Sequence, residues 1–231
     1  MDVMLKLMRN LALGLTLAIS TLAPVAAFAA GQAAPLALSA EQQQAVKRIS
    51  DYLNSYQSLK ATFNQVSPRG VLTSGTLYIA KPGKLRFDYA NNPLLVVADG
   101  RWLTIKDRVR EKGDQFPLSS TPLRLVVSPQ IDLLAETNVI AFDSHDGITS
   151  VTLQDRKSNI GGYITLMFDE QLKQLQQWVA VDGKDRRTTV QLSHIEFGGK
   201  FDPKLRFSLL VKESCKEAFR TNACAMSQIV G

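Results

Sequence analysis

Histidine is scarce in this sequence, which holds two histidines, His145 and His194, in 231 residues. A hydrolase with a Ser-His-Asp or Cys-His site needs a base within hydrogen-bond reach of its nucleophile. Neither histidine has such a signature around it, and we expect both to be ordinary surface or strand residues. The sequence also lacks the nucleotide-binding, serine-hydrolase and zinc-protease motifs. We therefore expect no catalytic residue, no metal and no cofactor.

Cysteine is equally scarce, and the two cysteines, Cys215 and Cys224, lie close together near the C-terminus. Their spacing matches no zinc motif, and the two histidines supply no obvious further ligands. In an exported chain the oxidising compartment permits a disulfide between them, and two free thiols are the alternative.

A strong charge of one sign is also missing, because 27 Lys and Arg residues accompany 21 Asp and Glu residues. Such a mild positive excess gives no reason to expect a nucleic-acid partner. Two basic runs, at residues 106–112 and 184–187, fall at predicted turns. We interpret them as solvated loops, and a docking surface is the alternative.

The N-terminus carries an apolar run over residues 11–22, which follows Lys6 and Arg9 and precedes an Ala27-Phe28-Ala29 site. A membrane-spanning helix needs about 20 apolar residues. This run is shorter and is followed by the small residues that a signal peptidase requires. Residues 1–29 are therefore predicted to be a signal peptide that is cleaved on export.

An amphipathic helix is predicted after a small-residue linker over residues 30–38. Ser39 is a suitable N-cap, and Gln42 stands at the capping-box position. Apolar residues at helical spacing form one stripe, which comprises Val46, Ile49, Leu53 and Tyr56. The helix either packs flat on the core or covers a cavity.

From residue 59 onward the apolar residues recur with a period of two, for example over 75–80 and 85–89, which is typical of strands. Further strands are predicted over residues 94–98, 102–106, 109–114, 139–144, 148–154, 163–168, 175–181, 188–197 and 205–211. The pairs Asp99-Gly100, Asp146-Gly147 and Asp182-Gly183 each separate two such runs. Glycine supplies the positive φ of a tight hairpin, so these pairs predict an antiparallel sheet.

One segment, residues 117–134, interrupts the strands. Thr121-Pro122 can start a helix with proline in its first turn, and apolar residues follow. The sequence therefore predicts a mainly β fold, an incompletely closed antiparallel β-barrel of about 11 strands. A helix and a short helical insert would cover one opening, and a sheet of this size can enclose a ligand cavity. The domain is predicted to span residues 39–211.

A series of short motifs between residues 59 and 134 carries a resemblance to a known family. The motifs are Phe63-Asn64-Gln65, Gly75-Thr76-Leu77, the run Lys81-Pro82-Gly83-Lys84-Leu85-Arg86-Phe87-Asp88-Tyr89, then Pro93, Asp99-Gly100 and Thr121-Pro122-Leu123. Their order resembles that of the outer-membrane lipoprotein carrier protein family, LolA. Weaker likeness continues to about residue 207, and the tail over residues 212–231 has no counterpart and no assigned role.

The resemblance implies a curved sheet with helices as a lid over a hydrophobic cavity, which holds the acyl chains of a lipoprotein crossing the periplasm. The matching positions for acyl-chain binding are Leu53, Leu85, Phe87, Tyr89, Leu123 and Val126. The family also has an arginine that hydrogen-bonds lid carbonyls and keeps the empty carrier shut. Lys81 stands at that position, and its flexible ammonium should hold the lid less firmly than a planar guanidinium. Arg86 is not expected to replace that arginine, because its side chain alternates to the opposite face of the predicted strand from Leu85.

By the same resemblance, the partners are outer-membrane lipoproteins, an inner-membrane ABC transporter that loads the carrier, and an outer-membrane receptor that accepts the cargo. The carrier itself is expected to be a periplasmic monomer. Two other hypotheses stay open: a periplasmic protein of the same fold that binds or senses another lipid, and an esterase. The scarcity of histidine argues against the esterase, because it leaves few bases to activate a nucleophile.

Overall fold

The computed structural model describes residues 34–110, 112–157, 161–169, 174–201, 205 and 207. Its helical elements are α1 (Ala40–Asn54), η1 (Leu118–Ser120), α2 (Arg124–Val127) and α3 (Leu133–Glu136). Its strands are β1 (Ser58–Val66), β2 (Leu72–Ala80), β3 (Lys84–Tyr89), β4 (Leu94–Asp99), β5 (Trp102–Asp107), β6 (Lys112–Pro117), β7 (Thr137–His145), β8 (Ile148–Asp155), β9 (Tyr163–Asp169), β10 (Gln174–Val181) and β11 (Arg187–Phe197). None of the described helices has the length and apolar character that crossing a membrane needs.

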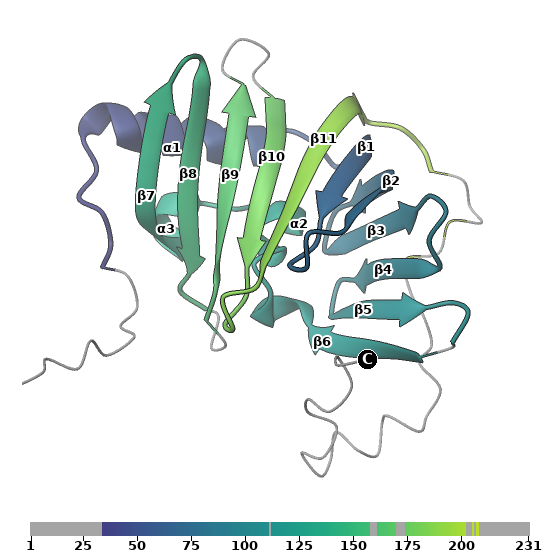
Figure 1. The fold of residues 1–231 in the computed structure, drawn as a ribbon. Helices are drawn as coiled ribbons and strands as arrows, with labels where there is room; N and C mark the ends of the chain where they lie inside the picture. The colour runs from purple at the N-terminus through teal and green to yellow at the C-terminus, as the bar shows by residue number, and fades with distance from the viewer. Residues whose placement is uncertain are drawn as a thin grey trace, which may run out of the picture. The chain divides into compact units, whose positions relative to one another are not determined.

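The strands form one 11-stranded antiparallel sheet in the order β6-β5-β4-β3-β2-β1-β11-β10-β9-β8-β7. Strand β1 pairs with both β2 and β11 and so joins the two ends of the domain. Successive strands rotate steadily, from nearly upright at β7 to nearly horizontal at β6 (Figure 1), as expected from the twist of sheets. Because β6 and β7 are the edges, the sheet is open along one side. The predicted fold class is confirmed.

Helix α1 forms where the sequence predicts it, because its N-terminus is capped on both sides. The Ser39 Oγ accepts from the Gln42 backbone N–H at 3.3 Å, and the Gln42 Oε1 accepts from the Ser39 N–H at 2.9 Å. The predicted stripe of Val46, Ile49 and Leu53 is buried against the apolar side chains of the sheet. Tyr56, just beyond the helix, is buried with them.

Three predicted boundaries differ from the structure. The strand predicted over 109–114 is β6, which begins at Lys112, because the Asp107 carboxylate accepts from the N–H groups of Val109 and Arg110 and so forms a turn. The helical insert over 117–134 consists of three short pieces rather than one helix. In the turn after β10, Asp185 rather than Gly183 has a positive φ, and the Asp182 N–H donates to the Arg186 carbonyl.

Several predictions fall on residues outside the described ranges. They concern the leader over residues 1–29, the linker up to residue 33, both cysteines and the tail over 212–231. Of the strand predicted over 205–211, Leu205 and Phe207 are described, and neither lies in a strand. Instead, the Phe207 ring packs on Phe201, whose ring meets Tyr78 of β2 at 5.5 Å.

Candidate functional site

The inner face of the sheet is a continuous apolar layer, and strand register builds it. Leu85 and Phe87 of β3 lie opposite Ala98 and Val96 of β4, so their side chains share one face with them. These four residues are buried in one core cluster with the rest of the inner face. The alternation that predicts the strand therefore also determines which side chains face inward.

Aromatic rings dominate the middle of this layer. The Phe63 ring packs edge-on against Phe87 at 4.9 Å and Tyr89 at 5.1 Å, and Phe87 also meets Trp178 of β10 at 6.2 Å. Phe63 and Trp178 are fully buried, yet sequence reasoning did not include them in the site. Their position at inward-facing points of predicted strands was the available signal. The aromatic centre of the layer therefore combines residues of β1 and β3 with one residue of β10.

Two helical segments cover this layer. Leu53 of α1 and Val126 of α2 are fully buried in the same cluster as the β3 residues, and Leu123 packs against the cluster while partly buried. The structure therefore brings all six predicted acyl-chain residues into one apolar region. In this closed arrangement, lid side chains lie directly on the inner face of the sheet.

Tyr89 places a polar group at the edge of the apolar layer. Its hydroxyl donates to the Gln65 Oε1 at 3.0 Å, and burial raises the pKa of Tyr89 to about 12. The phenol is therefore neutral at physiological pH. The layer keeps its uncharged character even where a polar atom enters it.

Lys81 connects the sheet to the lid. Its Nζ donates to the Leu53 carbonyl in the last turn of α1 and lies 4.1 Å from the centre of the Tyr56 ring. A cation is favourable at a helix C-terminus and over an aromatic face. Burial lowers the pKa of Lys81 to about 8. Lys81 therefore connects the β2–β3 turn to α1, which are the two parts that the predicted lid latch would have to join.

The turn after Lys81 makes a second contact with the lid. The Gly83 N–H donates to the Val127 carbonyl of α2 at 2.8 Å. An added Cβ at Gly83, whose φ is +70°, would lie 2.5 Å from the Gly100 Cα, so only glycine fits where the two hairpin turns meet. At Gly100 it is the φ of +100° rather than the approach that favours glycine.

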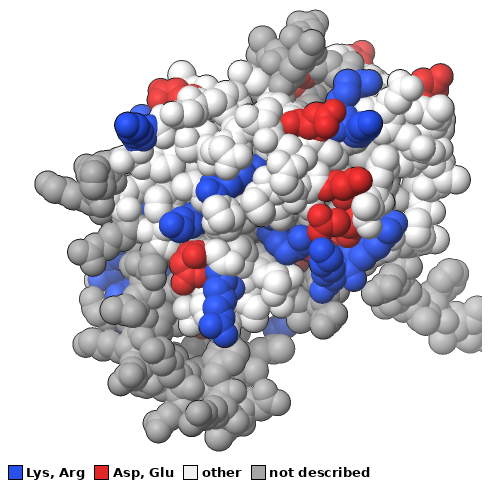
Figure 2. All heavy atoms as spheres, turned by 180° about the vertical axis from the view of Figure 1, so that it is seen from behind, with Lys and Arg blue, Asp and Glu red and all other residues white. Residues whose placement is uncertain are grey.

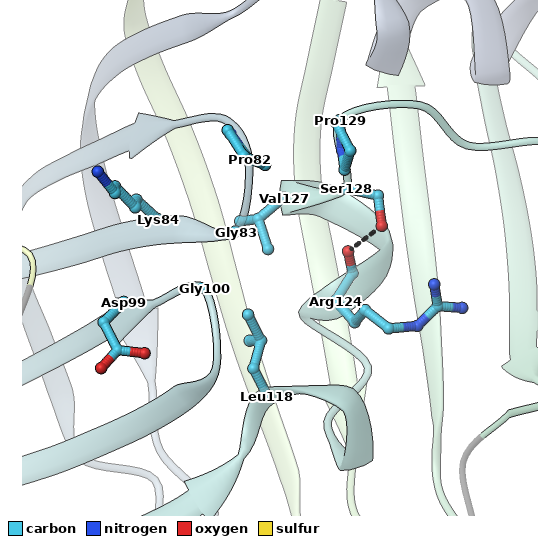
Figure 3. Close-up of a pocket in the computed structure, with 10 residues that line it drawn as sticks. All are labelled: Pro82, Gly83, Lys84, Asp99, Gly100, Leu118, Arg124, Val127, Ser128 and Pro129. Carbon is cyan, nitrogen blue, oxygen red and sulfur yellow. Dashed lines mark hydrogen bonds between the residues drawn. The ribbon is translucent and has the colours of Figure 1, made fainter.

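A recess of about 420 Å³ lies beside this contact, between the two hairpin turns and α2 (Figure 3). It is lined by Pro82, Gly83, Lys84, Asp99, Gly100, Leu118, Arg124, Val127, Ser128 and Pro129. The Arg124 guanidinium points away from Lys84 and Asp99 (Figure 3). The recess therefore marks a lightly packed border of the lid rather than a charged binding site.

The two parts of the lid are bonded to each other. The Asn54 side chain at the end of α1 donates to the Ile131 carbonyl and accepts from its N–H, each at 2.9 Å. The Ser50 hydroxyl accepts from the Leu133 N–H at 3.1 Å. Because these bonds join the C-terminal half of α1 to the end of the insert, we interpret the two as one lid.

An ion-pair network anchors the insert to the β7 and β8 side of the sheet. The Arg124 Nε lies 2.7 Å from the Asp155 carboxylate at the end of β8, and its Nη1 lies 3.1 Å from Glu136 of α3. Burial alone would lower the pKa of Arg124, but the two carboxylates outweigh it and raise that pKa. Sequence reasoning missed this network, although a charge within the apolar Leu123-Arg124-Leu125 run was a signal.

The other charged residues singled out in the sequence lie away from this site. Arg86 forms a two-pronged pair with Asp88, its Nη2 lying 2.7 Å from the carboxylate, on the opposite face of β3 from Leu85. His145 is exposed and lies 2.7 Å from Asp143. Within the part of the chain that the structure describes, no group of three or more His, Cys, Asp or Glu side chains is arranged to hold a metal.

Comparison with known proteins gives a family for this arrangement. A family model described as outer membrane lipoprotein carrier protein LolA matches residues 54–208. A relative in Chromobacterium violaceum, named outer-membrane lipoprotein carrier protein, is 38% identical over 109 residues, which cover 44% of this chain and 50% of the relative. A protein of the same name in Pseudomonas aeruginosa is 28% identical over 176 residues, covering 71% of this chain and 83% of the relative. The chain therefore spans about half of the first relative and most of the second.

Solved structures of similar fold are more distant in sequence. An uncharacterized conserved protein from Thermus thermophilus has a TM-score of 0.42 at 11% identity, covering 74% of this chain and 96% of that one. A LolA superfamily protein from Nitrosomonas europaea has a TM-score of 0.39 at 9% identity, covering 72% of this chain and 97% of that one.

Proposed function

Because the chain belongs to the outer-membrane lipoprotein carrier protein family, LolA, we propose that it is a periplasmic chaperone for lipoproteins. It binds their acyl chains between the inner face of the sheet and the helical lid, and carries them from the inner to the outer membrane. The observation that supports this most is the apolar inner face, with Leu85 and Phe87 buried under α1 and α2. The role is binding and transport, without catalysis.

The physical problem that such a carrier solves is the exposure of acyl chains to water. Each methylene moved into water costs about 0.8 kcal/mol, so two or three long chains cost an upper bound of tens of kcal/mol. Free diffusion of a lipoprotein across an aqueous compartment is therefore negligible. A carrier must provide comparable apolar surface and must hide that surface when empty. The closed lid meets the second requirement.

Cargo has to take the place of lid side chains. Leu53 and Val126 occupy the surface that acyl chains would contact, so loading requires the lid to move away from β3. The contacts that resist this movement on the β2–β3 side are the Lys81 bond to the Leu53 carbonyl and the Gly83 bond to the Val127 carbonyl. Few polar contacts have to break there, which suits a lid that opens and closes repeatedly.

The energy and direction of transfer have to come from partners, because the chain has no nucleotide-binding motif. The partners proposed are an inner-membrane ABC transporter that loads the carrier and an outer-membrane receptor that unloads it. The carrier acts as a monomer between them.

The experiment that tests this function is lipoprotein release from spheroplasts of a Gram-negative bacterium. Spheroplasts incubated with the purified protein should release lipoprotein into the supernatant, detected by immunoblotting. Leu123→Glu should reduce release more than tenfold, because it places an unpaired carboxylate against the acyl chains. Leu123 is only partly buried, so this variant should still fold.

The matched control is Val109→Glu, which introduces the same charge in the exposed turn before β6. It should release as much lipoprotein as the wild type. A wild-type protein that retains phospholipid but releases no lipoprotein would overturn the proposal. That result would favour a lipid-binding or lipid-sensing protein of the same fold.

A further inference from the structure

The turn between β1 and β2 presents three aliphatic side chains to solvent. Val66, Val71 and Leu72 are 40%, 55% and 69% exposed; Val66 and Leu72 flank a turn of five residues, and Val71 is the last residue of that turn. Most large apolar side chains of the described residues are buried or partly buried. Three exposed ones within seven positions therefore form a distinct feature, which we call the hairpin tip, residues 66–72.

Local hydrogen bonds hold this tip in a defined shape. The Ser67 N–H donates to the Val71 carbonyl at 3.0 Å, and the Ser67 hydroxyl accepts from the Val71 N–H at 3.1 Å. Gly70 has a φ of +79° and donates from its N–H to the Ser67 carbonyl at 2.9 Å. The aliphatic side chains are therefore displayed by an ordered turn, although nothing in the described chain covers them.

The charge around the hairpin tip has a positive excess. No Asp or Glu occurs between Asp51 and Asp88, a segment that contains the whole β1–β2 hairpin and Arg69 at its tip. The neighbouring tip is that of β10 and β11, because Val66 lies opposite Thr189 of β11. That tip carries Lys184, Arg186 and Arg187 beside Asp182 and Asp185, so together with Arg69 cations outnumber acids by four to two.

On the face seen in Figure 2, acidic and basic side chains are intermixed, with uncharged surface between them. The hairpin tip and its neighbour instead combine exposed aliphatic residues with an excess of cations. Such a combination matches a bilayer with anionic headgroups, where aliphatic side chains enter the interface and cations lie at the phosphates.

From these observations we infer that the hairpin tip docks on anionic phospholipid membranes, with Val71 and Leu72 in the headgroup region and Arg69 and Arg187 at the phosphates. A narrow turn provides little of the roughly 800 Å² per partner that a stable protein interface buries. It also lacks the Trp and Tyr side chains that anchor such interfaces. A bilayer needs neither, because it deforms around the tip.

The contact is weak and reversible, since three aliphatic residues and two cations do not anchor a protein permanently. That property suits a carrier that visits a membrane and leaves it, a point that rests on the proposed function. Membrane contact would shorten the path of an acyl chain between bilayer and carrier. Docking itself does not require the lid to open.

The test is flotation of the purified protein with vesicles that contain phosphatidylglycerol and phosphatidylethanolamine, compared with vesicles of phosphatidylcholine alone. The wild type should float with the anionic vesicles at low salt and be released by high salt. A double variant, Val71→Ser with Leu72→Ser, should bind at least tenfold more weakly. Arg69→Gln should weaken binding several-fold and reduce its salt dependence.

The matched control is Val109→Ser, which removes a valine that is more exposed than Val71 from the turn before β6 and should leave vesicle binding unchanged. Equal flotation of the wild type and the double variant would overturn the inference, as would absence of wild-type binding to anionic vesicles. If the double variant instead lost lipoprotein release without any vesicle binding by the wild type, the tip would contact a protein. Vesicle binding is measured without cargo, so its failure is distinguishable from failure of the carrier function.

Discussion

Lys81 combines attractive contacts to the lid with the cost of burying a charge. Its ammonium bonds the Leu53 carbonyl and faces the Tyr56 ring, yet burial lowers the pKa of Lys81 to about 8 from 10.5. The folded, closed state therefore releases this proton more readily than the unfolded chain does. Between pH 8 and 10.5 the unfolded chain holds more protons, so the stability contributed by Lys81 increases as the pH rises.

We predict that the wild type gains stability relative to Lys81→Met when the pH is raised from about 7 to about 9.5. Urea denaturation of both proteins at the two pH values measures this gain, because titration of the tyrosines cancels in the difference. A difference in the free energy of unfolding that stays constant between the two pH values would contradict the assigned environment of Lys81.

Gly75 is a residue whose importance follows from a close approach rather than from a charge. An added Cβ at Gly75 would lie 2.0 Å from the Asp88 carbonyl oxygen on β3, so no larger residue fits between β2 and β3. We predict that Gly75→Ala lowers the free energy of unfolding by about 1–3 kcal/mol, as overpacking does. Gly199→Ala, where a Cβ meets nothing within 4 Å, is the control and should be nearly neutral. Equal stability of the two variants, measured by thermal and chemical denaturation, would refute the steric argument.

Among the elements, the insert that carries α2 and α3 is held unevenly. Arg124 joins it to Asp155 at the end of β8 and also pairs with Glu136 of α3 within the insert, whereas Gly83 makes a single backbone bond to it on the β2–β3 side. The insert is therefore expected to stay attached to the β7–β8 side when the lid opens. The Lys81 side, next to the recess, is where it should separate first.

The ion-pair network gives a prediction at this scale. Arg124→Gln removes the cation that pairs with the buried Asp155 carboxylate. The loss should cost about 2–4 kcal/mol of stability after allowing for partial exposure of Glu136. Lys157→Gln removes an exposed partner of the same Glu136 and should cost less than about 1 kcal/mol. Chemical denaturation compares the two variants directly. Similar small losses for both would mean that Arg124 does not anchor the insert.

Elements with a local signal were predictable from the sequence. The capping box at Ser39 and the apolar stripe after it specify α1, and alternation specifies strands such as β3. The start of β6 was not predictable, because the Asp107 side chain forms a turn where Val109 suggests a strand. The insert breaks into short pieces because its contacts come from distant residues, such as Asn54 with Ile131.

The same distinction holds for the candidate site. The inward positions of Leu85 and Phe87 follow from a period of two, so they could be predicted. The Arg124 pair with Asp155 joins residues 31 positions apart in the chain, so the local pattern around Arg124 shows an unusual charge but does not indicate its partner. Trp178 of β10 meets Phe87 because β1 pairs with β11, a long-range pairing that periodicity does not reveal. Phe63 meets Phe87 through the consecutive strands β1, β2 and β3.

At the scale of the whole molecule, the proposed carrier is one curved sheet with a movable lid, whose apolar surface stays hidden until cargo arrives. An open sheet between β6 and β7 leaves the lid room to move, and the lid contacts that must break are few on the β2–β3 side. The hairpin tip between β1 and β2 would bring such a carrier to a membrane surface. The molecule would therefore be soluble between the membranes and weakly attached at each of them.

Native mass spectrometry shows directly what the apolar surface binds. The protein, incubated with spheroplasts and recovered from the supernatant, should appear as a one-to-one complex with a triacylated lipoprotein. The Leu123→Glu variant treated in the same way should appear without cargo. A wild-type protein that carries phospholipid or an isoprenoid, with no lipoprotein in complex, would contradict the account and assign the apolar face to another lipid.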